Sequence, residues 1–287
     1  MEDIYKLKPE QFPKPLLEIP QPPKILYIRG SLPSPDLVYL AVVGSRKYTS
    51  YGKEICDRLI KGLKGYPIVI VSGLAMGIDT IAHKAALEND LITISFPGSG
   101  LDNNVLYPRS NIKLAQDIVN HGGCLISEFE PNFISMLYSF PQRNRLMAGI
   151  SRAVLIIEAE EKSGTLITAR MALDYNRDVL AVPGSALSSN SDGTNRLIKQ
   201  GATPITKSED ILEALGFKIE KIKQTDKEKY ADCSKEEMKI IELLREGMER
   251  DDLIRESKMD VAKANALLSI MEIKDLIKEE MGEIRKN

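Results

Sequence analysis

A buried strand that ends in a glycine-serine-arginine turn constrains this chain more than any other feature of its sequence. Residues 38–43 (VYLAVV) form an apolar, β-branched run, which is typical of a strand buried on both faces of a sheet. Gly44, Ser45 and Arg46 follow directly, and a helical pattern opens at Ser50. Backbone N–H groups at a helix start favour anions, and the planar guanidinium of Arg46 matches phosphate oxygens. The turn therefore predicts an anion site; the alternative is a glycine that only eases a tight bend.

Apolar runs alternate with amphipathic helical patterns along most of the chain. Strands are predicted at 38–43, 68–71, 91–95, 124–126, 153–157 and 179–182, and helices near 50–64, 77–89, 110–120, 141–149, 165–175 and 193–200. Strands separated by helices indicate βαβ units. The predicted fold class is therefore α/β: an extended Rossmann-like, mostly parallel sheet with helices on both faces, plus a small C-terminal winged-helix-like domain.

Shifts in composition divide the chain into four segments. Residues 1–36 hold eight prolines, which argue against a helix and predict an extended N-terminal arm with one short strand at 25–28. Residues 37–217 carry the Rossmann-like pattern. Residues 218–233 are expected to be a charged linker. Residues 234–287 are expected to form the winged-helix-like domain, with helices at 234–246, 249–256 and 260–272 and a strand at 276–278; a small helical bundle is the alternative.

Overall composition excludes several classes of protein. The net charge of -2 excludes a chain that is basic throughout, so any site for a polyanion has to be local. We expect no signal peptide and no membrane span, because no long apolar run occurs. Three scattered cysteines and two histidines make a metal site improbable and point to a cytoplasmic protein, with Cys56 and Cys124 as buried thiols. The P-loop and dinucleotide fingerprints are both absent, so we expect no cofactor.

Polar or small residues follow several of the predicted strands. Besides the turn at 44–46, these are Ser72 and Gly73, residues 96–98, Glu128 and Glu158. Ligands of parallel sheets bind beyond the carboxyl ends of the strands, so these residues should meet at one edge.

The stretch SGLAMGID at 72–79 brackets a helix start with glycines, which lets backbone N–H groups approach a phosphate. We expect Asp79 to cap this helix or to orient the loop rather than to act in catalysis. His83 lies one helical turn later, and a structural hydrogen bond between the two is expected.

Two further helix starts carry residues suited to anions. Arg109 precedes a helix start, where a cation is unfavourable unless an anion is shared; the alternative is a solvent-exposed arginine. Ser163, Gly164 and Thr165 open another helix and predict anion binding, unless one hydroxyl is simply an N-cap.

The most informative polar cluster is FPQRNR at 140–145. Phe140 beside Arg143, Asn144 and Arg145 suits single-stranded nucleic acid, because a base can stack on the ring while guanidinium groups hold phosphates. Alternatively, Phe140 belongs to the core and an arginine pairs with Glu128 or Glu158. We expect at least one arginine to do so.

In these stretches the chain resembles the DNA-processing protein A (DprA/Smf) family of bacterial transformation. The resemblance covers about residues 20–216. It rests on GSR at 44–46, SGLAMGID at 72–79, GLDNNVLYPRSN at 100–111, GGCLISE at 122–128, FPQRNRLMAGIS at 140–151, EAEEKSGTLITA at 158–169 and GTNRLIKQGA at 193–202. The family's PPG-like stretch is Pro131-Asn132 here, so that loop differs.

The resemblance implies a Rossmann-like domain that binds single-stranded DNA, forms a homodimer and helps load the RecA recombinase, with no catalytic residue assigned. Carried over by position, Gly44, Ser45 and Arg46 would hold backbone phosphate. Arg109 would be a basic contact, and Phe140 near Arg143 would lie in the DNA pocket. The family's C-terminal winged-helix domain fits residues 234–287.

A Rossmann-like phosphoribohydrolase is the alternative function. Such enzymes carry a PGGxGTxxE signature, whereas residues 161–165 read EKSGT and lack the double glycine. For the C-terminal domain, the balanced charge favours protein interaction or regulation over the binding of duplex DNA.

Overall fold

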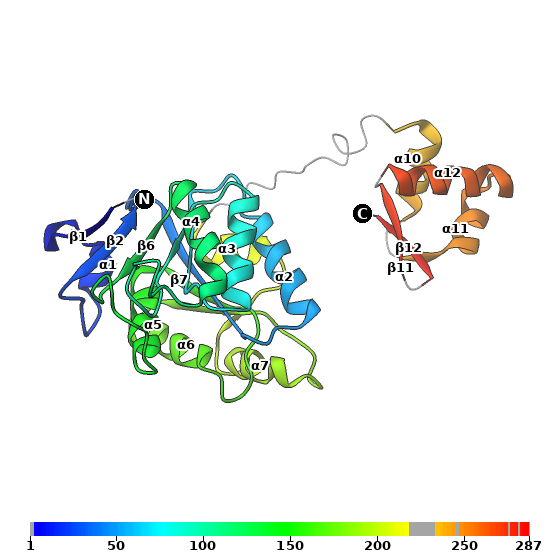
Figure 1. Ribbon diagram of the computed structural model, residues 1–287. Helices are drawn as coiled ribbons and strands as arrows, with labels where there is room; N and C mark the ends of the chain where they lie inside the picture. The colour runs from blue at the N-terminus through cyan, green and yellow to red at the C-terminus, as the bar shows by residue number, and fades with distance from the viewer. Residues whose placement is uncertain (1–2, 218–232, 245–246, 275, 281, 287) are drawn as a thin grey trace. The chain divides into compact units, whose positions relative to one another are not determined.

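A computed structural model describes residues 3–217, 233–244, 247–274, 276–280 and 282–286. The chain divides into two compact units, Met1–Ile219 and Glu220–Asn287, and each is described by itself. Figure 1 shows the elements of both units. The predicted linker at 218–233 lies outside the described residues except for Cys233.

A nine-stranded sheet organises the first unit, in the order β1-β2-β6-β5-β4-β3-β7-β8-β9. The strands β6 to β9 in this order are parallel to one another, whereas β2 pairs antiparallel with both β1 and β6. The predicted, mostly parallel Rossmann-like sheet is confirmed. Its strands are β1 (Ile4–Leu7), β2 (Leu26–Gly30), β3 (Val38–Val43), β4 (Ile68–Ser72), β5 (Thr93–Ser95), β6 (Cys124–Ser127), β7 (Ala153–Ile156), β8 (Asp178–Ala181) and β9 (Thr203–Pro204).

Helices cover both faces of this sheet, because side chains of a strand alternate between its two faces. Leu40 and Val42 of β3 pack with α2 (Ser50–Lys61), α3 (Ile78–Glu88) and α8 (Ser208–Ala214). Ala41 and Val43 pack with α5 (Ser139–Ile150), α6 (Thr165–Asp174) and α7 (Asp192–Lys199). The helix α4 (Ile112–Asn120) packs beside α3 over β6. Both faces of β3 are therefore buried, as its apolar sequence predicts.

The N-terminal arm departs from the prediction. It contributes β1 to the edge of the sheet, a 3-10 turn at Pro9–Gln11 and one turn of helix, α1 (Lys14–Leu17), whose Leu16 is fully buried against α5. The expectation of a helix-free arm was wrong, because Pro15 lies in the first turn, where its missing N–H removes no intrahelical bond.

The second unit holds three helices and a small antiparallel sheet. The helices are α10 (Lys235–Leu243), α11 (Arg250–Ser257) and α12 (Val261–Ile273), and the sheet has the order β10-β12-β11, with β10 at Met248–Glu249, β11 at Ile277–Glu280 and β12 at Glu283–Lys286. Helices followed by a β-hairpin are the winged-helix layout, and the all-helical alternative is wrong. In the ranges described for both units, no helix is long and hydrophobic enough to cross a bilayer.

Candidate nucleic-acid interface

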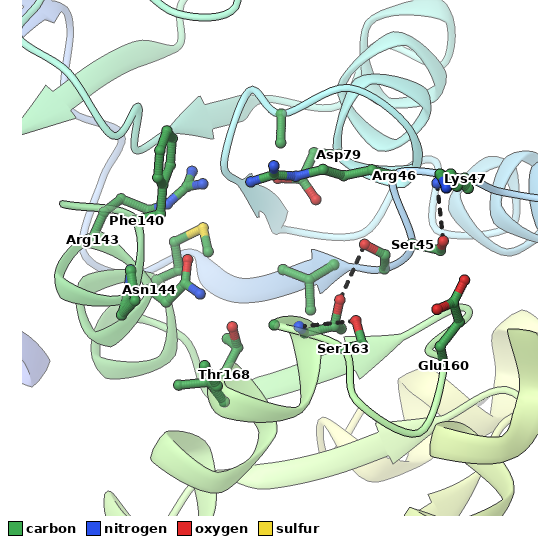
Figure 2. A pocket seen from close by; sticks show the side chains of 18 residues that line it. Ser45, Arg46, Lys47, Asp79, Phe140, Arg143, Asn144, Glu160, Ser163 and Thr168 are labelled. Carbon is green, nitrogen blue, oxygen red and sulfur yellow. Dashed lines mark hydrogen bonds between the residues drawn. The ribbon is translucent and has the colours of Figure 1, made fainter. Parts of the chain in front are cut away.

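A pocket opens at the carboxyl ends of β3 and β7, in the middle of the parallel sheet. After β3 the chain proceeds to one side of the sheet, and after β7 it proceeds to the other. The loops that follow two such strands diverge and leave a crevice between them. The crevice has a volume of about 430 Å³ and is lined by residues 43–47, by the first half of α5 and by residues 160–168 (Figure 2). Of the strand ends that were expected to meet here, the turn at 44–46 lines the crevice and the other predicted ones do not.

The turn at 44–46 forms one wall and is fixed by hydrogen bonds on both sides. Thr165 Oγ1 donates to the Gly44 carbonyl at 3.1 Å, and the Ile78 N–H donates to the Ser45 carbonyl at 3.2 Å. A Cβ atom on Gly44 would lie 2.7 Å from Ile78, so only glycine fits. The turn therefore holds Arg46 exposed at the pocket edge.

Arg46 extends across the opening towards Phe140 (Figure 2). Its guanidinium carbon lies 5.5 Å from the centre of the Phe140 ring, which is the geometry of a cation–π contact. The ring is half-buried and rests on Gly98, where a Cβ atom would lie 2.6 Å from it. A planar cation and an aromatic face thus lie next to each other at the mouth of the pocket.

Arg143 is buried, whereas the sequence suggested that it contacts nucleic acid. Its side chain is 4% exposed, and Nη1 donates to the backbone carbonyls of Gly73 and Phe96, at the ends of β4 and β5. Burial lowers its pKa to about 10, so the guanidinium stays charged at neutral pH. The guanidinium still borders the pocket, and its Nη1 group holds two strand ends together.

Asp79 completes this buried arrangement. Its Oδ2 accepts the Gly73 N–H at 3.1 Å. Burial raises the pKa of the Asp79 carboxyl, while the Arg143 charge and backbone donors act in the opposite direction. Asp79 orients the loop after β4, as predicted.

Arg145 lies outside the pocket. It forms an ion pair with Glu128 inside the protein and donates to the Gln21 carbonyl of the N-terminal arm. Burial raises the pKa of Glu128, and the Arg145 charge partly offsets this effect. The expectation that at least one arginine of the cluster pairs with a rim carboxylate is confirmed, and Arg145 is not placed for contact with a ligand of the pocket.

Glu158, the other rim carboxylate, has no arginine partner in the described part of the chain. It accepts the Thr49 N–H at 3.0 Å and the Thr49 hydroxyl at 2.6 Å, and it packs on Gly52. Glu158 therefore anchors the start of α2.

Several other predicted residues have structural partners. Ser72 is buried and donates to the Val42 carbonyl at 2.7 Å, outside the pocket, while Gly73 borders a smaller hollow beside it. The predicted bond between His83 and Asp79 is wrong: His83 Nδ1 lies 2.7 Å from Thr93 Oγ1, because its buried ring faces the sheet. Cys56 and Cys124 are fully buried, and burial raises the pKa of both thiols.

Arg109 lies in the 3-10 helix Arg109–Asn111, outside the pocket lining, and its exposed side chain has no ion pair or hydrogen bond in the ranges described above. The neighbouring Asn111 donates to the Leu74 carbonyl at 2.8 Å, which ties this turn to the loop that follows β4. Arg109 thus stands on a fixed backbone near the site.

The start of α6 forms the opposite wall. Ser163, Gly164 and Thr165 border the pocket, and Ser163 Oγ accepts the Thr165 N–H at 3.2 Å. Gly164 is exposed, and a Cβ atom there would meet nothing within 4 Å. The positive end of the helix dipole therefore faces an open pocket.

Sequence reasoning missed several residues that border the site. They are Lys47, Met76, Tyr107, Glu160 and Thr168. Thr168 was within reach of prediction, because it lies three residues after Thr165 on the same helix face. No described group of His, Cys, Asp and Glu side chains could hold a metal ion.

Comparison with known proteins decides the family. A family model described as DNA recombination-mediator protein A matches residues 3–216. The chain belongs to this family. Protein Smf of Escherichia coli is 42% identical over 208 residues, which cover 72% of this chain and 55% of the relative. DNA processing protein DprA of Streptococcus pneumoniae is 41% identical over 213 residues, with 74% of each chain covered.

Solved structures of the recombination-mediator family share the fold. The X-ray structure of DprA from Streptococcus pneumoniae has a TM-score of 0.67 at 39% identity and covers 76% of this chain and 75% of its own. A Helicobacter pylori structure, described as giving insight into a unique single-stranded DNA binding mode of DNA processing protein A, has a TM-score of 0.65 at 32% identity and covers 75% of this chain and 98% of its own. This chain thus has the fold of solved members of its family.

Proposed function

We propose that this chain binds single-stranded DNA at the pocket between β3 and β7. The observation that carries the proposal is the Arg46–Phe140 pair at the pocket mouth, where a cation and an aromatic face lie 5.5 Å apart. A single strand presents alternating phosphates and bare bases, and it requires this combination of donors and stacking surfaces. The single-stranded DNA binding described for the Helicobacter pylori relative supports the assignment.

The pocket walls suit the phosphate backbone. The turn at 44–46 and residues 163–165 offer backbone N–H groups and hydroxyls from two sides, and Arg46 and Lys47 supply the positive charge. Phe140 offers its ring to a base, and Asn144 borders the same space one turn of α5 later. Contacts of this kind are indifferent to base identity, so we expect weak sequence preference.

Three residues of the predicted site act indirectly in this proposal. Arg143 and Ser72 hold the strand ends that form the rim, and Arg145 holds the N-terminal arm. Arg109 extends the contact surface for phosphates beyond the pocket.

Fluorescence anisotropy with a labelled oligothymidine tests the proposal. The wild-type chain should bind the single strand more tightly than a duplex of the same length, and affinity should fall between about 50 and about 200 mM salt. Arg46→Ala should weaken binding about tenfold or more, as the loss of one charge-assisted contact implies. Glu54→Ala, an exposed change on the outer part of α2, serves as the control. Equal affinity of wild type and Arg46→Ala would place the site elsewhere.

We further propose that the chain acts as a homodimer that passes the bound strand to the RecA recombinase. The family description as a recombination mediator supports this role. Sedimentation velocity tests the dimer. The rate at which RecA assembles on a single strand coated with a competing binding protein, measured with and without this chain, tests the transfer. An unchanged rate would contradict it.

Turnover of a nucleotide remains the alternative function. Glu160 borders the pocket and is exposed, so a carboxylate is available near a bound sugar. Release of free base from nucleoside monophosphates by purified protein, abolished in Glu160→Gln, would favour the enzyme.

A further inference from the structure

A second, shallow hollow of about 10 Å³ lies on the other side of the Arg46–Phe140 pair, so a ligand there rests on its exposed surface and does not enter it. Arg46, Ala75, Phe140 and Arg143 border both hollows, so this pair forms the partition between them. The second hollow is completed by Gly73, Met76, Tyr107 and Pro108. Its surfaces differ in kind from those of the main pocket, since they are aromatic and thioether faces rather than hydroxyls at a helix start.

The ring of Tyr107 is exposed on a backbone that is held firmly. Its two neighbours, Leu106 and Pro108, are both buried, and the Leu106 N–H donates to the Asp102 carbonyl at 2.9 Å. Tyr107 as a whole is nevertheless 46% exposed, and its ring centre lies 6.0 Å from the centre of the Phe140 ring at an angle of 60°. The exposure of this ring is therefore a property of a fixed loop.

Met76 is presented in the same way from the loop that follows β4. Leu74, two residues earlier, is fully buried, and Gly77 adopts a positive φ of 90° that only glycine readily takes. Met76 itself is 52% exposed. A methionine thioether is polarizable and contacts aromatic rings favourably.

We propose that this hollow is a nucleobase subsite, in which the face of Tyr107 stacks on one unpaired base while Met76 and Phe140 contact its edges. The inference rests on the proposed function, because the base belongs to a nucleotide next to the phosphate in the main pocket. Arg46 lies in the partition and is therefore placed to hold the phosphate that links the two nucleotides.

The chemistry of the hollow favours a base over a free phosphate. The Gly73 N–H, the Gly73 carbonyl and the Nη1 group of Arg143 are already hydrogen-bonded within the protein. Apart from Arg46 in the partition, the other side chains that border the hollow are aromatic or apolar, and every base has a π-face that stacks on an aromatic ring. The subsite should therefore accept any base.

Paired probes test the subsite. Wild type, Tyr107→Ala and Tyr107→Phe are titrated with an oligothymidine and with an abasic oligomer of the same length and charge. Tyr107→Ala should bind the oligothymidine about fivefold more weakly or worse and the abasic oligomer as wild type does, whereas Tyr107→Phe should bind both normally. Equal losses on both probes, or no loss on either, would overturn the subsite. Failure of the wild type to bind any single strand would instead overturn the proposed function.

A fluorescent reporter gives an independent readout, because the chain contains no tryptophan. In Tyr107→Trp, the indole should be quenched by the oligothymidine and not by the abasic oligomer. Tyr5→Trp is a matched control, since Tyr5 is 45% exposed and lies in β1 at the far edge of the sheet. Quenching in the control equal to that at position 107 would show non-specific contact and contradict the subsite.

Discussion

Arg143 donates to the backbone carbonyl of Gly73, the residue whose N–H group is bound by Asp79. One peptide segment is thus held by a cation on one side and an anion on the other, both of them buried. Arg143, which the sequence suggests as a DNA contact, therefore holds the loop after β4 in place. This separates residues that bind from residues that shape the site, and the two classes should respond differently to mutation.

Arg143→Ala should destabilise the fold, and Arg46→Ala should not. Arg143→Ala leaves the Gly73 and Phe96 carbonyls without their buried donor, and each unsatisfied buried group costs about 1–3 kcal/mol. The loss of an exposed cation–π contact at Arg46 costs about 0.5–1 kcal/mol. Denaturant unfolding of both variants checks this. Equal stability of the two variants would contradict this structural role of Arg143.

Gly44 and Gly164 should also respond differently to mutation: a change at Gly44 should lower stability, and a change at Gly164 should weaken binding. Gly44→Ala forces a Cβ atom to within 2.7 Å of Ile78 and should cost about 1–3 kcal/mol of stability. Gly164→Ala places its methyl group in open space and should cost less than about 1 kcal/mol, yet it should weaken binding of a single strand, because the methyl group lies where a phosphate approaches the start of α6. Unfolding curves and anisotropy titrations of both variants provide the comparison, and unchanged affinity in Gly164→Ala would argue against phosphate at this wall.

The buried His83 should make stability depend on pH. Thr93 Oγ1 donates to the Ile70 carbonyl and so accepts from His83 Nδ1, which leaves Nε2 without a partner among the described atoms. Burial lowers the pKa of His83 to about 3. The unfolded chain therefore takes up a proton below pH ~6.5 that the folded chain does not, and stability falls as the pH decreases from about 6.5 towards 3.

His83→Gln isolates this contribution. Between about pH 6 and 4 the slope of unfolding free energy against pH should be smaller in the variant, by up to ~1.4 kcal/mol per pH unit. Asp79 and Glu128 titrate in both proteins, so their effect cancels in the difference. Parallel curves for wild type and variant would show that the histidine takes up its proton in the folded state.

Removing Arg145 alone from its ion pair with Glu128 should lower the free energy of unfolding more than changing both residues does. Arg145→Met leaves a buried carboxylate, one oxygen of which has no hydrogen-bond partner in the described structure, and should cost about 3–5 kcal/mol. Adding Glu128→Gln should recover part of that loss, since a neutral amide needs no counter-ion. A double-mutant cycle measured by denaturant unfolding tests this, and simple additivity of the two changes would be evidence against the pair.

The sheet and the location of the site could be predicted from sequence because both follow from local pattern. Residues 38–43 match β3 in full, since a strand buried on both faces has to be apolar throughout and ends where that pattern ends. The short elements α1, α8, β1 and β9 escaped prediction. Their residues are few, and their stability comes from packing on elements distant in sequence.

The roles of the charged residues could be predicted only in part. Arg46, Arg143 and Arg145 all read as phosphate ligands, yet the structure exposes the first, buries the second under two strand ends and pairs the third with Glu128. A guanidinium serves equally well for carbonyls, carboxylates and phosphates, so residue type alone does not select among them. Tyr107 was missed because an exposed tyrosine carries no distinctive spacing.

The hydrogen bond from Thr165 to the Gly44 carbonyl joins residues 121 positions apart, and it has a consequence for synthesis on the ribosome. A growing chain displays the turn at 44–46 long before the start of α6 has been translated. One wall of the pocket then exists without the other, and contacts between such distant segments form late because a long loop has to close first. Translation products that end before residue 165 should therefore fail to bind a single strand at this pocket, and that capacity should appear only once the start of α6 has been translated.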